Sequence, residues 1–98
     1  MAKKGYLVSA YRNIKDPDKL AAYAKVAGPA FAKYGARYLV RDTAAAAYEA
    51  GVKQRIVIVE FDSVETAMKA HDSADYQAAL KVLGNAAERD MRIVEGLE

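Results

Sequence analysis

The sequence contains no cysteine and no tryptophan, one histidine and two prolines. Without cysteine the chain has neither disulfides nor thiolate chemistry, which is usual in a reducing cytosol. One histidine and no clustered carboxylates make no credible ligand set for a metal ion. No apolar run approaches the ~20 residues of a membrane span, and the N-terminus lacks a signal-peptide core. We therefore expect a cytoplasmic protein without a metal site and without a membrane partner.

Charge and length narrow the choice further. The 15 basic and 13 acidic side chains alternate along the chain and leave a net charge of +2. A nucleic-acid-binding protein usually gathers its basic residues on one face, so we expect no nucleic-acid partner. Hydrophobic residues make up 53% of the 98 residues, but 21 residues are alanine. The larger apolar side chains can fill one core, which predicts a single domain over residues 1–98.

Residues 55–61, Arg-Ile-Val-Ile-Val-Glu-Phe, are rich in β-branched side chains and predict a strand at the centre of a sheet. Residues 6–11 predict a first strand, and residues 36–42 and 90–97 predict two more. In the first strand, alternation places one set of side chains on one face (Tyr6, Val8 and Ala10). It places the other set on the opposite face (Leu7, Ser9 and Tyr11). In the second strand, alternation places Tyr38 and Val40 on one face. It places Arg37, Leu39 and Arg41 on the other face.

Two helical regions lie between these strands. Asp16-Pro17 is a typical helix start, and Gly35 is a typical residue just beyond a helix end. Pro29 predicts a kink near residues 25–28. A second helical region starts at Asp62-Ser63, is interrupted at residues 72–75, and ends at Gly84. The four alanines within residues 43–54 favour a helix, but this linker is short and joins two strands. We therefore expect an extended arm or hairpin over residues 45–49.

The predicted order is strand, helix, strand, strand, helix, strand. This is the βαββαβ order of an α+β ferredoxin-like sandwich, a four-stranded antiparallel sheet with two helices on one face. The other face is bare, and we expect it to carry apolar side chains (Leu7, Tyr11, Leu39, Ile56, Ile58 and Val94). Such a patch is unfavourable in water. A second copy packed sheet against sheet would cover it, which predicts a homodimeric α+β barrel.

Several segments form a recognisable combination: Asp16-Pro17, Tyr23, Ala27-Gly28-Pro29, residues 33–41, Val59-Glu60-Phe61, residues 72–77 and Val94-Glu95-Gly96. Together they resemble the DUF1330 family of the dimeric α+β barrel superfamily. The resemblance covers nearly the whole chain and implies a ferredoxin-like protomer in a two-sheet barrel. Relatives in the superfamily include cofactor-independent monooxygenases, haem-degrading enzymes, isomerase-like proteins and ligand-binding domains. The chain departs from the family pattern at Ala44–Ala47, where a more β-prone stretch is usual.

Glu60 follows Ile56 and Ile58 at period two, so its carboxylate lies on a hydrophobic face and needs a cationic partner. Arg41, Arg37 or Arg92 can provide one. One interpretation is a structural ion pair at the barrel edge. The other is a carboxylate–guanidinium pair in a pocket that orients an acidic or carbonyl-bearing small molecule, with Arg41 as a ligand-binding residue.

His71, the single histidine, and Glu60 are the candidate catalytic residues. A helical histidine is more often a residue at the edge of the core. A haem-degrading relative would pair it with a tryptophan, which this chain lacks, and we expect no cofactor. Tyrosine hydroxyls can line a cavity between the sheet and the helices (Tyr11, Tyr23, Tyr38 and Tyr76).

Three functions remain open at this stage. The leading hypothesis is a protein that binds a small acidic or carbonyl-bearing molecule, with Tyr11, Tyr38, Arg41 and Tyr76 as ligand-binding residues. The second is a cofactor-independent monooxygenase or isomerase. The third is a structural or assembly module with no ligand site.

Overall fold

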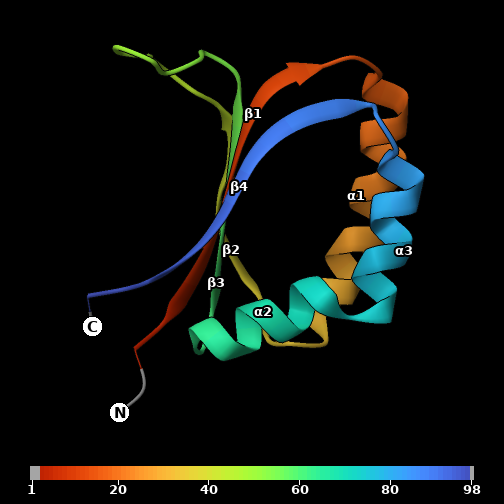
Figure 1. Cartoon of the computed structure of the whole chain (residues 1–98), viewed down its shortest axis with the longest axis vertical. Coiled ribbons are helices and arrows are strands. Elements are labelled where there is room, and N and C mark those ends of the chain that lie inside the picture. Colours follow the sequence, from red (N-terminus) through yellow and green to blue (C-terminus); the bar gives the residue numbers. More distant parts are fainter. Residues whose placement is uncertain (1–2, 98) are drawn as a thin grey trace.

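Four antiparallel strands form one sheet, and the helices lie against one face of it (Figure 1). The computed structural model describes residues 3–97. The strand order is β2-β3-β1-β4, so the first and third strands are central, as in ferredoxin-like folds. The elements in chain order are β1 (Gly5–Ile14), α1 (Pro17–Ala32), β2 (Arg37–Thr43), β3 (Arg55–Phe61), α2 (Val64–Asp72), α3 (Ala74–Leu83) and β4 (Ala87–Glu95).

The chain between β3 and β4 forms two helices, so the sheet carries three helices and the prediction of two was wrong. Ser73 separates α2 from α3. Its backbone is extended, and its hydroxyl donates to the carbonyl of Ala70 and accepts from the amide of Tyr76. One serine therefore closes α2 and caps α3. None of the helices in residues 3–97 has both the length and the apolar character that crossing a membrane requires.

The helices cover the face of β1 that we expected to be bare. Leu7 and Tyr11 are buried against the helices and only 1% and 4% exposed. The intervening residues of β1 lie on the open face (Tyr6, Val8 and Ala10). The prediction that Leu7 and Tyr11 belong to the uncovered face was wrong. Alternation shows which residues share a face, whereas the path of the chain decides which face the helices cover.

The open face of the sheet is apolar at its centre. Val8 pairs with Ile58, and Ala10 pairs with Ile56, so the predicted position of both isoleucines is confirmed. Val94 lies beside Tyr6 on the same face and is 53% exposed. The face that lacks helices therefore carries a row of aliphatic side chains across three strands.

A bulge at Leu39 in β2 changes the direction of its neighbours. Tyr38 and Arg41 both pair with residues of β3 that face the helices, whereas Val40 pairs with Ile58 on the open face. Unbroken alternation predicted Tyr38 together with Val40, and Arg41 opposite them, and this was wrong. The extra residue brings the Tyr38 ring and the Arg41 guanidinium to the same side of the sheet.

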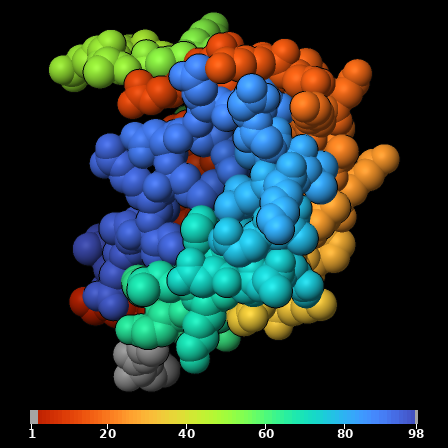
Figure 2. Space-filling view, turned by 45° about the vertical axis from the view of Figure 1, so that its right-hand side comes forward, coloured from red at the N-terminus to blue at the C-terminus, as the bar shows by residue number. Residues whose placement is uncertain are grey.

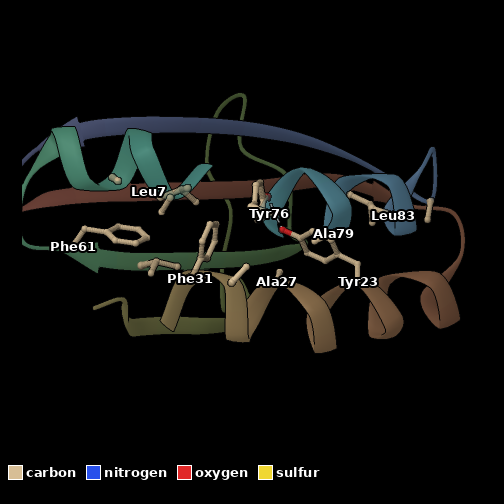
Figure 3. Packing of buried hydrophobic residues seen from close by; sticks show 13 residues of the cluster. Leu7, Tyr23, Ala27, Phe31, Phe61, Tyr76, Ala79 and Leu83 are labelled. Carbon is tan, nitrogen blue, oxygen red and sulfur yellow. Dashed lines mark hydrogen bonds between the residues drawn. The ribbon is translucent and has the colours of Figure 1, made fainter. Parts of the chain in front are cut away.

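The core fills the layer between the sheet and the helices (Figure 3). Phe31 of α1 stacks on Tyr76 of α3 with ring centres 4.5 Å apart, and meets Phe61 of β3 edge-on at 5.6 Å. Burying each of these large side chains contributes roughly 1.5–3 kcal/mol. Small side chains let the helices approach the sheet closely (Ala27, Ala30, Ala67, Ala70 and Ala79).

The connection between β2 and β3 is an arm, residues 44–54, that leaves the sheet on the side opposite the helices (Figure 1). In Figure 2 the arm, in green, projects at the upper left of the molecule. The amide of Ala44 donates to the carbonyl of Gln54 at 2.9 Å at its base, and Gly51 closes a turn on Tyr48 at 2.8 Å. None of the four alanines is helical, because a segment this short does not nucleate a helix; Ala45 lies in a bend and residues 49–50 form a turn.

Candidate functional site

A small cavity of about 50 Å³ lies between the sheet and α1. One water molecule needs about 10–15 Å³ of such space, so the cavity holds roughly four water molecules. All four strands contribute to it, and α1 closes it. Its polar lining consists of four hydroxyl side chains and three arginines (Ser9, Tyr11, Tyr23, Tyr38, Arg41, Arg55 and Arg89). No carboxylate from the described part of the chain lines it.

The six arginines of the chain fall into two groups of three. One group forms ion pairs with acidic side chains elsewhere on the sheet (Arg12, Arg37 and Arg92). The other group, Arg41, Arg55 and Arg89, lines the cavity, and none of these three forms an ion pair within residues 3–97. The cavity therefore concentrates three positive charges without a compensating carboxylate. Such an arrangement is suited to a bound anion.

Arg89 lies at the β4 end of the cavity between two tyrosine rings. Its guanidinium carbon is 4.9 Å from the centre of the Tyr23 ring and 5.6 Å from that of Tyr11. Its Nη1 donates to the Tyr23 hydroxyl at 3.0 Å. Burial alone would lower the pKa of Arg89, but its contacts with Tyr23 and Tyr76 outweigh burial and raise it. The guanidinium is therefore held in place, and it stays charged.

The hydroxyls of Tyr23 and Tyr76 share a hydrogen bond of 2.7 Å in the core, where the two side chains point toward each other (Figure 3). Burial, and then the neighbouring Tyr76, raise the pKa of Tyr23 above its ordinary range. The Tyr23 hydroxyl is therefore protonated at neutral pH. It acts as a hydrogen-bonding group that links α1, α3 and Arg89 rather than as a base.

Ser9 lies on β1 in the floor of the cavity. Ser9 is 2% exposed, and its hydroxyl oxygen has no hydrogen-bond partner within residues 3–97. A buried hydroxyl without a partner costs roughly 1–3 kcal/mol, so one is retained where a ligand or water can satisfy it. Ser9 is one of the residues that line the cavity, so a ligand there would lie close to this hydroxyl.

The β2 end of the cavity is its open side. Tyr38 is 38% exposed, and the Arg41 guanidinium stacks over its ring at 5.1 Å. Burial, and then Tyr23, raise the pKa of Tyr38. Arg55, half-buried on the neighbouring strand, lines the same space. Arg41 and Tyr38 thus border the route from solvent to the buried groups.

The structure brings most of the predicted ligand-binding residues together. Tyr11, Tyr38 and Arg41 line the cavity directly. Tyr76 reaches it only through its hydrogen bond to Tyr23. The tyrosines were expected between the sheet and the helices, whereas Arg41 was expected beside Glu60, and the structure places it in the cavity instead.

Glu60 lies elsewhere, on the open face of the sheet. Its carboxylate accepts from Arg37 Nε at 2.6 Å and from the Tyr6 hydroxyl at 2.9 Å. Of the three arginines named as partners from the sequence, Arg37 is the one that pairs with it. Arg37 also bonds to Asp62 at 3.1 Å, so Glu60 belongs to an ion-pair network at the end of the sheet. The sheet separates this network from the cavity.

His71 lies near the end of α2. Its Nδ1 is 3.0 Å from a carboxylate oxygen of Asp72, and its ring is 5.2 Å from that of Tyr76. It does not line the cavity. The structure therefore does not bring His71 and Glu60 together. Within residues 3–97, no group of three or more histidine and acidic side chains is arranged to hold a metal ion.

Sequence reasoning missed Ser9, Arg55 and Arg89 as cavity residues. A signal was present: each is a polar residue in phase with apolar ones that face the core. Arg89 precedes Met91 and Ile93 at period two, as Arg55 precedes Val57 and Val59. A polar residue that alternates in step with buried apolar residues along a strand is the pattern that would have indicated these three positions.

A second hollow, of about 390 Å³, lies between the arm and the open face of the sheet. The arm lines it chiefly with small side chains, and the sheet contributes Ala10 and Ile56. The Arg12–Asp90 ion pair, at 3.8 Å, lies at its border. This hollow is apolar and open, and it lies on the opposite side of the sheet from the three unpaired arginines.

Comparison with known proteins places the chain in a family. Residues 4–97 match the model of DUF1330, a domain of unknown function. The chain belongs to the DUF1330 family. No curated protein matches the sequence. The family resemblance seen in the sequence is thus confirmed over nearly its whole length, and the family description assigns no activity.

Solved structures share the fold of this DUF1330 protein at low sequence identity. RPA0582, a protein of unknown function from Rhodopseudomonas palustris, is 15% identical with a TM-score of 0.75, and the match covers 100% of this chain and 85% of that one. A dimeric ferredoxin-like protein of unknown function from Thermobifida fusca is 13% identical with a TM-score of 0.64, over 98% and 93% of the two chains. SnoaB, a cofactor-independent oxygenase from Streptomyces nogalater, is 9% identical with a TM-score of 0.64, over 99% and 96%.

Proposed function

We propose that this protein binds a small organic anion, an acidic or carbonyl-bearing molecule, in the cavity between its sheet and helices. The observation that carries the proposal is the set of three arginines, Arg41, Arg55 and Arg89, around a space without a described carboxylate. Guanidinium groups bind carboxylates through two parallel hydrogen bonds. The unpartnered Ser9 hydroxyl adds a donor inside the cavity.

The ring contacts of the arginines support this function. Arg89 lies over Tyr11 and Tyr23, and Arg41 lies over Tyr38. The two rings and the hydrogen bond to Tyr23 restrain the Arg89 guanidinium, while its remaining N–H groups can bind a ligand. A site whose cations are positioned before the ligand arrives loses less side-chain entropy on binding.

We also propose that two copies pack with their open faces together as a homodimeric α+β barrel. The aliphatic row on that face supports it, with Val8, Ile56 and Ile58 at the centre and Val94 at the side. The Thermobifida fusca neighbour is described as dimeric. Pairing of two such faces would remove the exposed apolar patch from water.

Catalysis without a cofactor is the alternative, because SnoaB has the same fold. Enzymes of this kind commonly need a general base with a pKa near neutrality. The described lining of the cavity offers cations and hydroxyls, and the pKa of Tyr23 is raised. These groups orient and stabilise an anion, so they favour binding over proton abstraction.

Isothermal titration calorimetry with a panel of short carboxylic acids, keto acids and hydroxy acids tests the binding function. We expect at least one acid to bind, and Arg89→Gln to weaken it tenfold or more. Lys81→Gln is the control, because Lys81 is an exposed cation on α3 that lines neither the cavity nor the open face. If no acid binds, or if both variants weaken binding equally, the cavity is not the site.

A further inference from the structure

The cations of the cavity stand at two ends rather than in one cluster. Arg89 on β4 pairs in register with Tyr11 on the adjacent strand β1. On the other side of β1, Ala10 pairs with Ile56 of β3. Because the strands are antiparallel, Tyr11 therefore lies opposite Arg55, the residue before Ile56. With strands about 4.8 Å apart, the Arg89 and Arg55 backbones are roughly 10 Å apart. The Tyr11 ring lies between them.

Arg41 belongs to the second of these ends. It lies on β2 opposite Val57, beside the strand that carries Arg55. One end of the cavity therefore carries Arg89, and the other carries Arg41 and Arg55. Ser9 lies on β1 between the two ends, one inward-facing position from Tyr11, with its hydroxyl unpartnered.

We propose that the ligand is a short dicarboxylate, with one carboxylate at Arg89 and the other at Arg41 and Arg55. This rests on the proposed anion-binding function and narrows it to a chemical class. A monoanion would satisfy one end and leave an unpaired guanidinium at the other. A dianion satisfies both ends, and the Ser9 hydroxyl can donate to a group in the middle.

The size of the cavity limits the chain between the carboxylates. Its volume of about 50 Å³ holds roughly four water molecules. A dicarboxylate of about three to five carbons has roughly seven to nine non-hydrogen atoms, more than this space holds. Only its inner part can therefore lie in the cavity, and its outer carboxylate must lie in the opening beside Tyr38. Arg41 is exposed there and can follow a ligand of slightly different length.

Calorimetry with paired acids separates this inference from the general function. Succinate and butyrate have the same number of carbons and differ in one carboxylate. We expect succinate to bind roughly ten- to a hundredfold more tightly, the effect of one additional charge-assisted contact. Inorganic phosphate is the third probe, because it carries comparable charge at a single centre, and we expect it to bind more weakly than succinate.

Variants at the two ends test the geometry. Arg41→Gln and Arg89→Gln should each lower the ratio of succinate to butyrate affinity toward one, whereas Lys81→Gln should leave that ratio unchanged. Circular dichroism checks that each variant is folded. If Arg89→Gln unfolds, the Arg41→Gln variant still tests the proposal, because Arg41 lies on an exposed edge strand.

The outcomes are distinct. If butyrate or phosphate binds as tightly as succinate, the dicarboxylate inference is overturned, while the anion-binding function stands. If none of the three probes binds at about 10 mM, and the wider acid panel also fails, the proposed function fails as well.

Discussion

Arg89 on β4 contacts Tyr23 on α1 in two ways: its guanidinium lies 4.9 Å from the ring centre and donates to the hydroxyl at 3.0 Å. The same hydroxyl lies 2.7 Å from that of Tyr76 on α3. One tyrosine oxygen thus joins the sheet to two helices. The cation of the candidate site and the packing of the core depend on the same side chain.

Removing that hydroxyl should cost stability. We expect Tyr23→Phe to lower the free energy of unfolding by about 1–3 kcal/mol, because Tyr76 and Arg89 both lose a partner. Tyr76→Phe should cost less, and the double variant should cost less than the sum of the two. Urea unfolding measures all three. Tyr48→Phe, at a side chain 79% exposed, is the control and should change stability by no more than about 0.5 kcal/mol. Additive effects would show that the hydroxyl pair is not coupled.

Ser9→Ala should separate stability from binding. The Ser9 hydroxyl is buried without a partner, so its removal should leave the free energy of unfolding unchanged or raise it by about 1 kcal/mol. Affinity for an anion in the cavity should fall, because the ligand loses a donor. Thermal unfolding and calorimetry on the same variant test both effects. A marked loss of stability without ligand would show that the hydroxyl has a structural partner.

Glu60→Gln should make stability less dependent on acid pH. Arg37, and then the Tyr6 hydroxyl, hold the pKa of Glu60 below its ordinary value. Because the pKa is lower in the folded state, the ionised carboxylate stabilises the fold above the unfolded pKa of about 4.3. That contribution is lost as the pH falls through the folded pKa. The variant should therefore be less stable than the wild type at pH 7, and the difference should shrink toward pH 3. Urea unfolding at both pH values measures it, and a constant difference would contradict it.

Ile58→Asp should dissociate the proposed dimer. Ile58 pairs with Val8 at the centre of the open face, where a carboxylate would be buried between two sheets. Sedimentation velocity at micromolar concentration should show a dimer for the wild type and a monomer for the variant. Val26→Asp introduces the same charge on α1, on the helix side of the molecule, and should remain dimeric. A monomeric wild type would contradict the proposed homodimeric barrel.

Gly5→Ala should destabilise the junction between β1 and α2. A Cβ at Gly5 would lie 2.5 Å from the carbonyl carbon of Ser63, which is backbone and cannot move aside easily. We expect a loss of about 1–3 kcal/mol, as for other overpacked sites. Urea unfolding measures the loss. An unchanged midpoint would show that β1 and the start of α2 can separate without cost.

Local patterns in the sequence determined the elements and their order. The β-branched run at residues 55–61, the Asp16-Pro17 helix start and the arm all follow from short-range preferences of the backbone and side chains. The central position of the first and third strands followed from the βαββαβ order. The number of tyrosines suggested hydroxyls between the sheet and the helices, and Tyr11 and Tyr38 lie there, although alternation had assigned Tyr11 to the uncovered face.

Only the tertiary structure decided which side of each strand meets the helices. Period-two alternation is symmetric, so it could not show that Leu7 and Tyr11 are covered while Val8 is bare. The bulge at Leu39 then turned Arg41 toward Tyr38, and neither the bulge nor its effect is visible in residue types. The three unpaired arginines come from three different strands, so their convergence depends on register and chain path. A sequence specifies local preferences, whereas a shared cavity arises only when distant segments pack together.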